Sequence, residues 1–221
     1  MSDLPAMLNL RGRRCVVVGG GGVARRRLAA LRAAGADLTV IAPQIQPEIP
    51  SLCDRIERRP YRQGDLDGAF LVVAATDSAA VNQQVSDGAR KVGALVNRAD
   101  DPASGDFSIP AHAHHGVLTL VVHTDGSAPF AAGTIRRELS EALDPDWPRL
   151  LEIIAPYRRR LLLGPADDKR RQRLARLSSP QAMKILKEDG TKNLRRFCEK
   201  LCGGNGHSDA RLGTAQLEAL D

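Results

Sequence analysis

The chain has 221 residues, of which 43% are apolar and 26% are charged, so it can form one large domain or two modest ones around a hydrophobic core. Aromatic residues make up only 3%, which argues against a surface that stacks nucleic-acid bases. The net charge is +6, and residues 136–221 contain 18 Lys and Arg against 13 Asp and Glu. This basic region favours an acidic partner, although a solvated arginine-rich helical surface has the same composition.

Two further features concern the compartment. No apolar stretch approaches the roughly 20 residues of a membrane-spanning helix, and the first 30 residues lack the pattern of a signal peptide. We therefore expect a cytoplasmic protein that binds neither membrane nor nucleic acid. In that compartment the four cysteines would be free thiols. They are Cys15, Cys53, Cys198 and Cys202.

Short apolar strands alternate with helices in the first hundred residues. Strands are predicted at residues 14–18, 38–41, 55–59, 69–75 and 94–97, and helices at residues 23–34 and 79–92. This alternation is typical of a doubly wound parallel sheet. In such a sheet the carboxyl ends of the strands lie at one edge, where ligands bind.

The pattern changes after Asp100. A longer strand is predicted at residues 116–124, paired with a short segment at 107–109, and a helix at residues 131–143. From Trp147 onward we predict only helices, with breaks at Pro156, Gly164-Pro165, Pro180 and Gly190. The predicted architecture is thus α/β, a Rossmann-type parallel sheet domain followed by a small α+β segment and a helical C-terminal domain. The predicted bounds are 1–112 for the first domain, 113–145 for the central segment, 146–203 for the helical domain and 204–221 for a flexible tail.

The glycine-rich segment after the first strand is the clearest motif. Residues 19–24 read Gly-Gly-Gly-Gly-Val-Ala, which satisfies Gly-x-Gly-x-x-Ala between a strand and a helix. Gly19 would permit the tight turn, Gly21 would let the backbone approach a diphosphate, and Ala24 would let the helix pack closely on the sheet. A purely structural turn is the alternative. The candidate contacts to a dinucleotide in this segment are Gly19, Gly21, Gly22, Val23 and Ala24.

The end of the second strand lacks the Asp or Glu that often holds the adenosine ribose of NAD. The chain continues there with Pro43 and Gln44, and Gln44 could make a neutral contact to the ribose. Residues 25–27 are all Arg and could attract a phosphate, but consecutive helical side chains point in different directions. The residues alone therefore leave both NAD and NADP open.

Two polar segments follow buried strands and are predicted at the same edge of the sheet. Thr76 and Asp77 would suit a contact to the nicotinamide or its ribose, although Asp77 would equally serve as the N-cap of the following helix. Asn97 and Asp100 follow the next strand, where a carboxylate could act as a general base beside a nicotinamide. The Asp-Asp-Pro sequence that begins at Asp100 equally favours a plain turn.

Two groups of potential metal ligands are weak candidates. His112, His114 and His115 lie close together but show no recognised ligand spacing. Cys198 and Cys202, with His207 after them, lack a fourth ligand for zinc. We therefore predict no metal site and leave the role of the histidines open.

Taken together, these segments resemble the precorrin-2 dehydrogenase and sirohydrochlorin ferrochelatase module of siroheme synthases. The resemblance covers roughly residues 4–145 and depends on the order and spacing of several short motifs. These are Gly19-Gly20-Gly21-x-Val23-Ala24, Ala74–Asp77, Val81-Asn82, Asn97, Asp100, Pro102, Phe107, Pro110 and Gly126-x-x-Pro129. The resemblance implies oxidation of precorrin-2 to sirohydrochlorin, with hydride transfer to NAD and with Asp100 as the acid/base residue.

The resemblance also implies partners. It implies a homodimer formed with the central segment and a tetrapyrrole substrate near Thr124 and Gly126. The carboxylates of that substrate would pair with Arg136 and Arg137, although a solvated helix surface explains these two arginines equally well. Ferrous iron would be a further substrate of a bifunctional enzyme. A non-catalytic nucleotide-sensing module, which would bind NAD but no tetrapyrrole, is the alternative outside the family.

Overall fold

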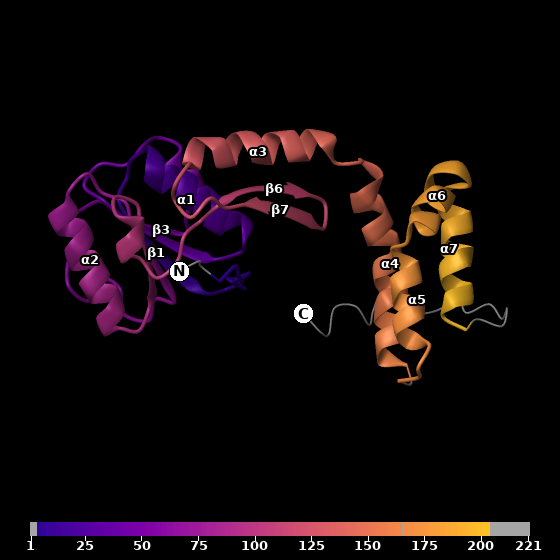
Figure 1. Ribbon diagram of the computed structural model, residues 1–221. Helices are drawn as coiled ribbons and strands as arrows, with labels where there is room; N and C mark the ends of the chain where they lie inside the picture. The colour runs from indigo at the N-terminus through magenta and orange to yellow at the C-terminus, as the bar shows by residue number, and fades with distance from the viewer. Residues whose placement is uncertain (1–3, 165, 204–221) are drawn as a thin grey trace. The chain divides into compact units, whose positions relative to one another are not determined.

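The computed structural model describes residues 4–164 and 166–203, and the chain divides into two compact units (Figure 1). Residues up to 110, together with 125–127, form the first unit. Residues 111–124 and those from 128 onward form the second. The flexible tail predicted for 204–221 lies outside the described residues.

The first unit is built on a parallel sheet. Its strands are β1 (Arg14–Val18), β2 (Asp37–Ile41), β3 (Arg55–Glu57), β4 (Leu71–Ala74) and β5 (Leu95–Arg98), in the spatial order β3-β2-β1-β4-β5. All neighbouring strands run parallel. The direction of strand succession reverses at β1, between β2 and β4, which is where doubly wound sheets bind their ligands.

Two helices cover the sheet, α1 (Gly22–Ala33) and α2 (Ala79–Lys91). Side chains of a strand alternate between the faces of its sheet, and β1 shows this: Cys15 and Val17 pack in the cluster that contains Leu28 of α1. Val16 and Val18 pack in the cluster that contains Val85 of α2. All five strands and both helices predicted for this part of the chain are confirmed, with bounds that differ by at most two residues.

A β-hairpin and a helix begin the second unit. Strand β6 (Ala111–His115) pairs antiparallel with β7 (Leu118–Val122), and α3 (Pro129–Ala142) packs on both. The predicted pairing of residues 107–109 with this strand is wrong. Gly116 has a φ of +56° and permits a two-residue turn, so the segments on either side of it pair with each other.

The rest of the second unit is helical. It consists of α4 (Asp146–Leu163), α5 (Arg170–Leu177), α6 (Pro180–Glu188) and α7 (Gly190–Leu201). The predicted break at Pro156 is wrong, because α4 continues through it and buries Ile154 and Leu161, on either side, in one apolar cluster. The fold class predicted from the sequence is confirmed. No helix in the described part of the chain is both long enough and apolar enough to cross a membrane.

Candidate functional site

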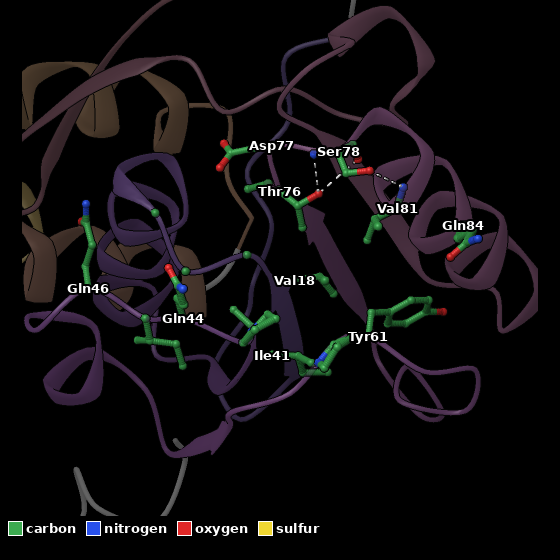
Figure 2. Close-up of a pocket in the computed structure, with 18 residues that line it drawn as sticks. Val18, Ile41, Gln44, Gln46, Tyr61, Thr76, Asp77, Ser78, Val81 and Gln84 are labelled. Carbon is green, nitrogen blue, oxygen red and sulfur yellow. Dashed lines mark hydrogen bonds between the residues drawn. The ribbon is translucent and has the colours of Figure 1, made fainter.

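A cavity of about 950 Å³ lies at the carboxyl edge of the sheet (Figure 2). Three loops supply most of its wall: Gly19–Gly21 after β1, Ala42–Gln46 after β2 and Ala75–Ser78 after β4. The other lining residues are Val18, Ile41, Pro60, Tyr61, Val81 and Gln84. Such a mostly apolar cleft with a few polar groups at its edge is typical of a cofactor site.

The glycine loop fits closely between its neighbours. A Cβ atom on Gly19, whose φ is +133°, would lie 2.2 Å from the Ala75 carbonyl oxygen. A Cβ atom on Gly20 would lie 1.9 Å from the Gln44 carbonyl oxygen. These two positions therefore require glycine for packing. Gly21 differs, since a Cβ atom there would have no atom within 4 Å and would occupy open space.

The start of α1 provides donors for an anion. Gly21 is the N-cap and has no capping side chain, and the first turn contains no acidic residue. The first backbone N–H groups of a helix have no partner within the helix and carry a partial positive charge. A diphosphate at Gly21 would satisfy them, so the open space at this glycine fits a dinucleotide.

Buried Asn82 holds the loop after β4 in place. The Thr76 amide and hydroxyl donate to Asn82 Oδ1 at 3.0 and 2.8 Å, and Asn82 Nδ2 donates to the Thr76 carbonyl at 3.0 Å. Ser78, rather than Asp77, is the N-cap of α2, accepting from the Val81 amide at 3.4 Å. Asp77 is thus left exposed on the cavity wall.

Asp100 lies beyond the end of β5, the strand next to β4. It is not among the lining residues. Its carboxylate accepts hydrogen bonds from Arg98, from Nε at 3.3 Å and from Nη2 at 2.9 Å. These bonds lower the pKa of the Asp100 carboxyl from its usual value, against the opposing effect of burial. Asp100 is therefore an oriented carboxylate at neutral pH.

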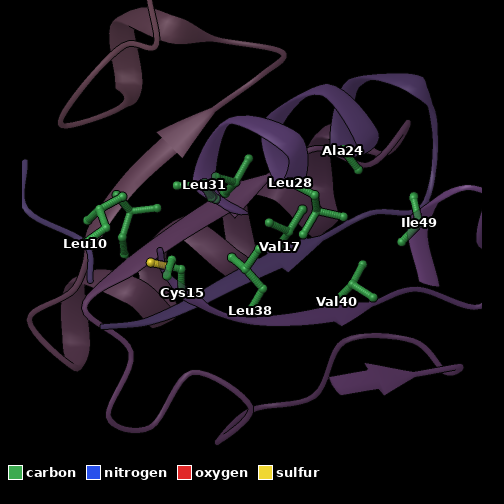
Figure 3. Packing of buried hydrophobic residues seen from close by; sticks show 12 residues of the cluster. Leu10, Cys15, Val17, Ala24, Leu28, Leu31, Leu38, Val40 and Ile49 are labelled. Atoms are coloured by element: carbon green, nitrogen blue, oxygen red, sulfur yellow. The ribbon is translucent and has the colours of Figure 1, made fainter. Parts of the chain in front are cut away.

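The predicted cofactor contacts fall into two groups. Six of them line the cavity: Gly19, Gly21, Pro43, Gln44, Thr76 and Asp77. Gly22, Val23 and Ala24 belong to the first turn of α1, and Ala24 is buried in the core beside Leu28 (Figure 3). Asn97 is buried in β5, where its Nδ2 donates to the Phe107 carbonyl at 2.9 Å. None of these four residues lines the cavity.

Of the candidate substrate contacts, Thr124 and Gly126 lie near the turn before α3, and Arg136 and Arg137 lie in the middle of this helix. Gly126 has a φ of +73°, and Asp125 before it has a φ of +47°. Arg136 is half-buried and Arg137 exposed on α3, while Thr124 follows β7. In the described residues no group of three or more His, Cys, Asp or Glu side chains is arranged to hold a metal ion.

Sequence reasoning missed most of the apolar wall of the cavity. Ile45, Tyr61 and Val81 come from three separate segments, and only the folded sheet brings them together. It also gave Asn82 and Arg98 no individual role. The available signal was a fully buried amide within the α2 pattern and a cation at the end of a buried strand, where such groups need specific partners.

The comparisons with known proteins agree with this geometry. Residues 6–111 match a family model described as putative NAD(P)-binding. The siroheme synthase of Nitrosococcus oceani is 36% identical over 165 residues, which cover 73% of this chain and 35% of that protein. The siroheme synthase of Chromobacterium violaceum is 40% identical over 162 residues, covering 72% and 34%. That of Pseudomonas aeruginosa is 34% identical over 213 residues, covering 94% and 46%. The chain thus spans about a third to a half of these relatives.

A solved structure matches over a greater share of its length. The structure of SirC, a precorrin-2 dehydrogenase, has a TM-score of 0.71 and 29% sequence identity, and the match covers 90% of this chain and all of that one. Together with the NAD(P)-binding model, it supports a nicotinamide cofactor for this chain. The chain therefore belongs to the family of precorrin-2 dehydrogenases and of the corresponding part of siroheme synthases.

Proposed function

We propose that this protein is an NAD-dependent dehydrogenase that oxidises precorrin-2 to sirohydrochlorin in siroheme synthesis. The single observation that carries the proposal is the glycine loop, whose packing leaves open space for an anion at Gly21. The match to a precorrin-2 dehydrogenase, which covers 90% of this chain and all of that one, supports it. When bound, the nicotinamide ring would accept a hydride from the reduced macrocycle. The protein's part is to bind both molecules and to accept the proton that leaves the macrocycle.

The lining of the cavity favours NAD over NADP. No Lys or Arg is among the lining residues in the part of the chain that the structure describes, whereas the 2′-phosphate of NADP usually pairs with a cation. Gln44 and Gln46 line the cavity after β2 and offer neutral hydrogen bonds to an unmodified ribose. Calorimetric titration with each nucleotide tests this, and equal or tighter binding of NADP would contradict it.

Asp100 is the proposed proton acceptor. Its carboxylate accepts hydrogen bonds from Arg98, which lower the pKa of the Asp100 carboxyl further below neutral pH. Asp100 follows β5, the strand beside β4, and the Thr76 loop follows β4. Purified protein with precorrin-2 and NAD should form sirohydrochlorin and NADH. General-base catalysis typically contributes 10²–10⁴-fold, so Asp100→Asn should lower kcat by about that factor without weakening NAD binding. Unchanged turnover in that variant would remove Asp100 from the mechanism.

Four further residues are proposed contacts to the tetrapyrrole. Arg136 and Arg137 would pair with its carboxylates, since a guanidinium binds a carboxylate through two parallel hydrogen bonds. Thr124 and Gly126 would contact it through the turn before α3. Replacing both arginines with Gln should raise KM for precorrin-2 and leave the Kd of NAD unchanged. An unaltered KM would show that the two arginines belong to an ordinary solvated surface.

Iron insertion is a second candidate activity. The relatives are named siroheme synthases, and siroheme is the iron chelate of sirohydrochlorin. Incubating the protein with sirohydrochlorin and ferrous iron, without NAD, and following the absorbance of siroheme decides between one activity and two. Asp100→Asn should be assayed beside the wild type, to show whether both activities need the same carboxylate.

We also propose a homodimer formed through the central segment. No residue of β6 or β7 is fully buried, and Ile135 and Leu139 of α3 are 41% and 49% exposed. Ile135 and Leu139 are neighbours on the helix surface, four residues apart, and adjoining exposed apolar side chains are a feature of protein interfaces. The double variant Ile135→Asp, Leu139→Asp should sediment as a monomer. Leu163→Asp, at a 79% exposed position of α4, is the matched control and should keep the wild-type sedimentation.

A further inference from the structure

A buried cation lies at the end of β5. Arg98 is only 6% exposed, and its guanidinium makes three hydrogen bonds. Two go to Asp100, at 3.3 and 2.9 Å, and the third goes to Gln83 Oε1 of α2 at 2.6 Å. Burying a guanidinium is costly unless its charge and its donors are matched. Its partners therefore indicate what the side chain does.

We propose that Arg98 is a positioning residue for Asp100: it fixes the orientation of the carboxylate at the edge of the sheet and places a positive charge against it. The inference rests on the proposed function, in which Asp100 accepts a proton. The guanidinium contacts both carboxylate oxygens, and its planar fork restricts the carboxylate to one plane. Each oxygen has a second lone pair that Arg98 does not use, so the carboxylate can still accept a proton.

The contacts of α2 support this role. Gln83 accepts from Arg98 and donates to Asp87 Oδ1 at 2.9 Å, which orients its amide. Asn82, the preceding residue, holds Thr76 on the cavity wall and also helps to lower the pKa of Asp100. One turn of α2 therefore positions both the wall of the cofactor cavity and the proposed proton acceptor.

The charges around the pair determine the effect of removing Arg98. Arg98 is the cation that faces Asp100, and the carboxylates of Asp101 on the same segment and Asp87 on α2 act on Arg98. Gln83 and Asn82 are the neutral polar groups from α2. Without Arg98, its hydrogen bonds and charge would no longer lower the pKa of Asp100, so this pKa would rise. Because a base works only when deprotonated, the enzyme would then lose activity at a higher pH as the solution is acidified.

The test is Arg98→Met, with the Asp100 carboxyl carbon followed by ¹³C NMR through a pH titration and assigned with Asp100→Asn. An opposite charge at this distance typically shifts a pKa by 1–3 units, so we expect the midpoint to rise by at least about one pH unit. The acidic limb of kcat/KM should move in the same direction, and the Kd of NAD should stay unchanged. An unchanged midpoint in folded Arg98→Met protein would overturn the proposal.

Three further variants complete the design. Arg59→Met removes another pair of this kind in the first unit, in which Arg59 donates to both carboxylate oxygens of Asp65 at 2.8 Å, and should leave the Asp100 midpoint at its wild-type value. Gln83→Leu removes only the third contact of Arg98 and should lower kcat less than Arg98→Met does. If Arg98→Met does not fold, Arg98→Lys decides: it keeps the charge but loses the planar fork, so the midpoint should stay low while kcat falls. Wild-type kcat in Arg98→Lys would overturn the positioning role.

The turnover assay tests the proposed function, and the titration tests the role of Arg98, so each can be contradicted without the other. If wild-type protein does not oxidise precorrin-2, the proposed function is wrong, whatever the NMR shows. If wild-type protein does oxidise precorrin-2 and the Asp100 titration has the same midpoint in wild-type and Arg98→Met protein, only the present inference is wrong.

Discussion

Adjacent glycines of the cofactor loop have different roles, one in packing and one in cofactor binding, and substitutions can distinguish these roles. At Gly20 a methyl group would lie 1.9 Å from the Gln44 carbonyl oxygen, which is backbone and cannot move aside. We expect Gly20→Ala to destabilise the protein by about 1–3 kcal/mol, as overpacking does. At Gly21 the methyl group meets no atom within 4 Å. Gly21→Ala should therefore keep the wild-type Tm and weaken NAD binding at least about tenfold, because the methyl group keeps the diphosphate from the backbone.

Thermal unfolding and calorimetric titration of both variants check this contrast. Gly68→Ala, at another glycine with open space but a φ of +71°, controls for the cost of a left-handed conformation. The interpretation of the loop would be wrong if Gly21→Ala bound NAD as tightly as the wild type.

Among individual residues, the sequence predicts those whose partners lie within a few positions along the chain. The glycine motif is recognisable because the turn and the helix start lie within six consecutive residues. Arg98 and Asn82 are different, since their partners come from another element or from a loop that only the fold positions. Their side chains look ordinary in the sequence, and their burial is the first sign of a function.

At the scale of elements, α4 contains a proline that does not end it. Pro156 lies inside Asp146–Leu163 and is exposed. It has no N–H to donate to the Glu152 carbonyl, and a proline inside a helix is unfavourable by about 3 kcal/mol relative to alanine. Pro156→Ala restores that hydrogen bond, while the more flexible unfolded chain offsets part of the gain. We expect the second unit to gain about 2 kcal/mol in its free energy of unfolding.

Chemical denaturation of the two proteins measures this difference. Ala155→Gly, at the neighbouring exposed position, should instead destabilise the same helix by about 1 kcal/mol. A loss of stability in Pro156→Ala would mean that the proline has a packing role on the surface of α4.

The two errors in the predicted elements have different physical origins. At Pro156 a local propensity was overridden by the apolar face of α4, which is buried on both sides of the proline. Residues 107–109 were expected to pair with the strand that follows Gly116. That strand pairs instead with Ala111–His115, which is closer to it in the sequence and joined to it by the Gly116 turn. Strands β1, β2 and β4 were predictable because each contains four consecutive buried residues, all of them apolar except Thr39 in β2.

At the scale of the whole molecule, the two units have separate hydrophobic cores. The clusters around Val17 and Val16 contain only residues of the first unit, and the cluster around Leu150 contains only residues of the second. The sequence pattern predicts a change after Asp100, and the observed division into two units falls at residue 110. The sequence could not place Ala111–His115, since a histidine-rich strand with little burial has no clear apolar pattern.

Separate cores imply separate unfolding transitions, and the cofactor should distinguish them. A ligand that binds only the folded state stabilises it by about 2.7 kcal/mol at a free concentration of 100 Kd. All residues that line the cavity belong to the first unit, so NAD should raise the Tm of one transition in scanning calorimetry and leave the other in place. Gly20→Ala should lower the transition that responds to NAD, and Pro156→Ala should raise the one that does not. A single transition that NAD shifts as a whole would instead show that the two cores unfold together, and both substitutions would then move the same peak.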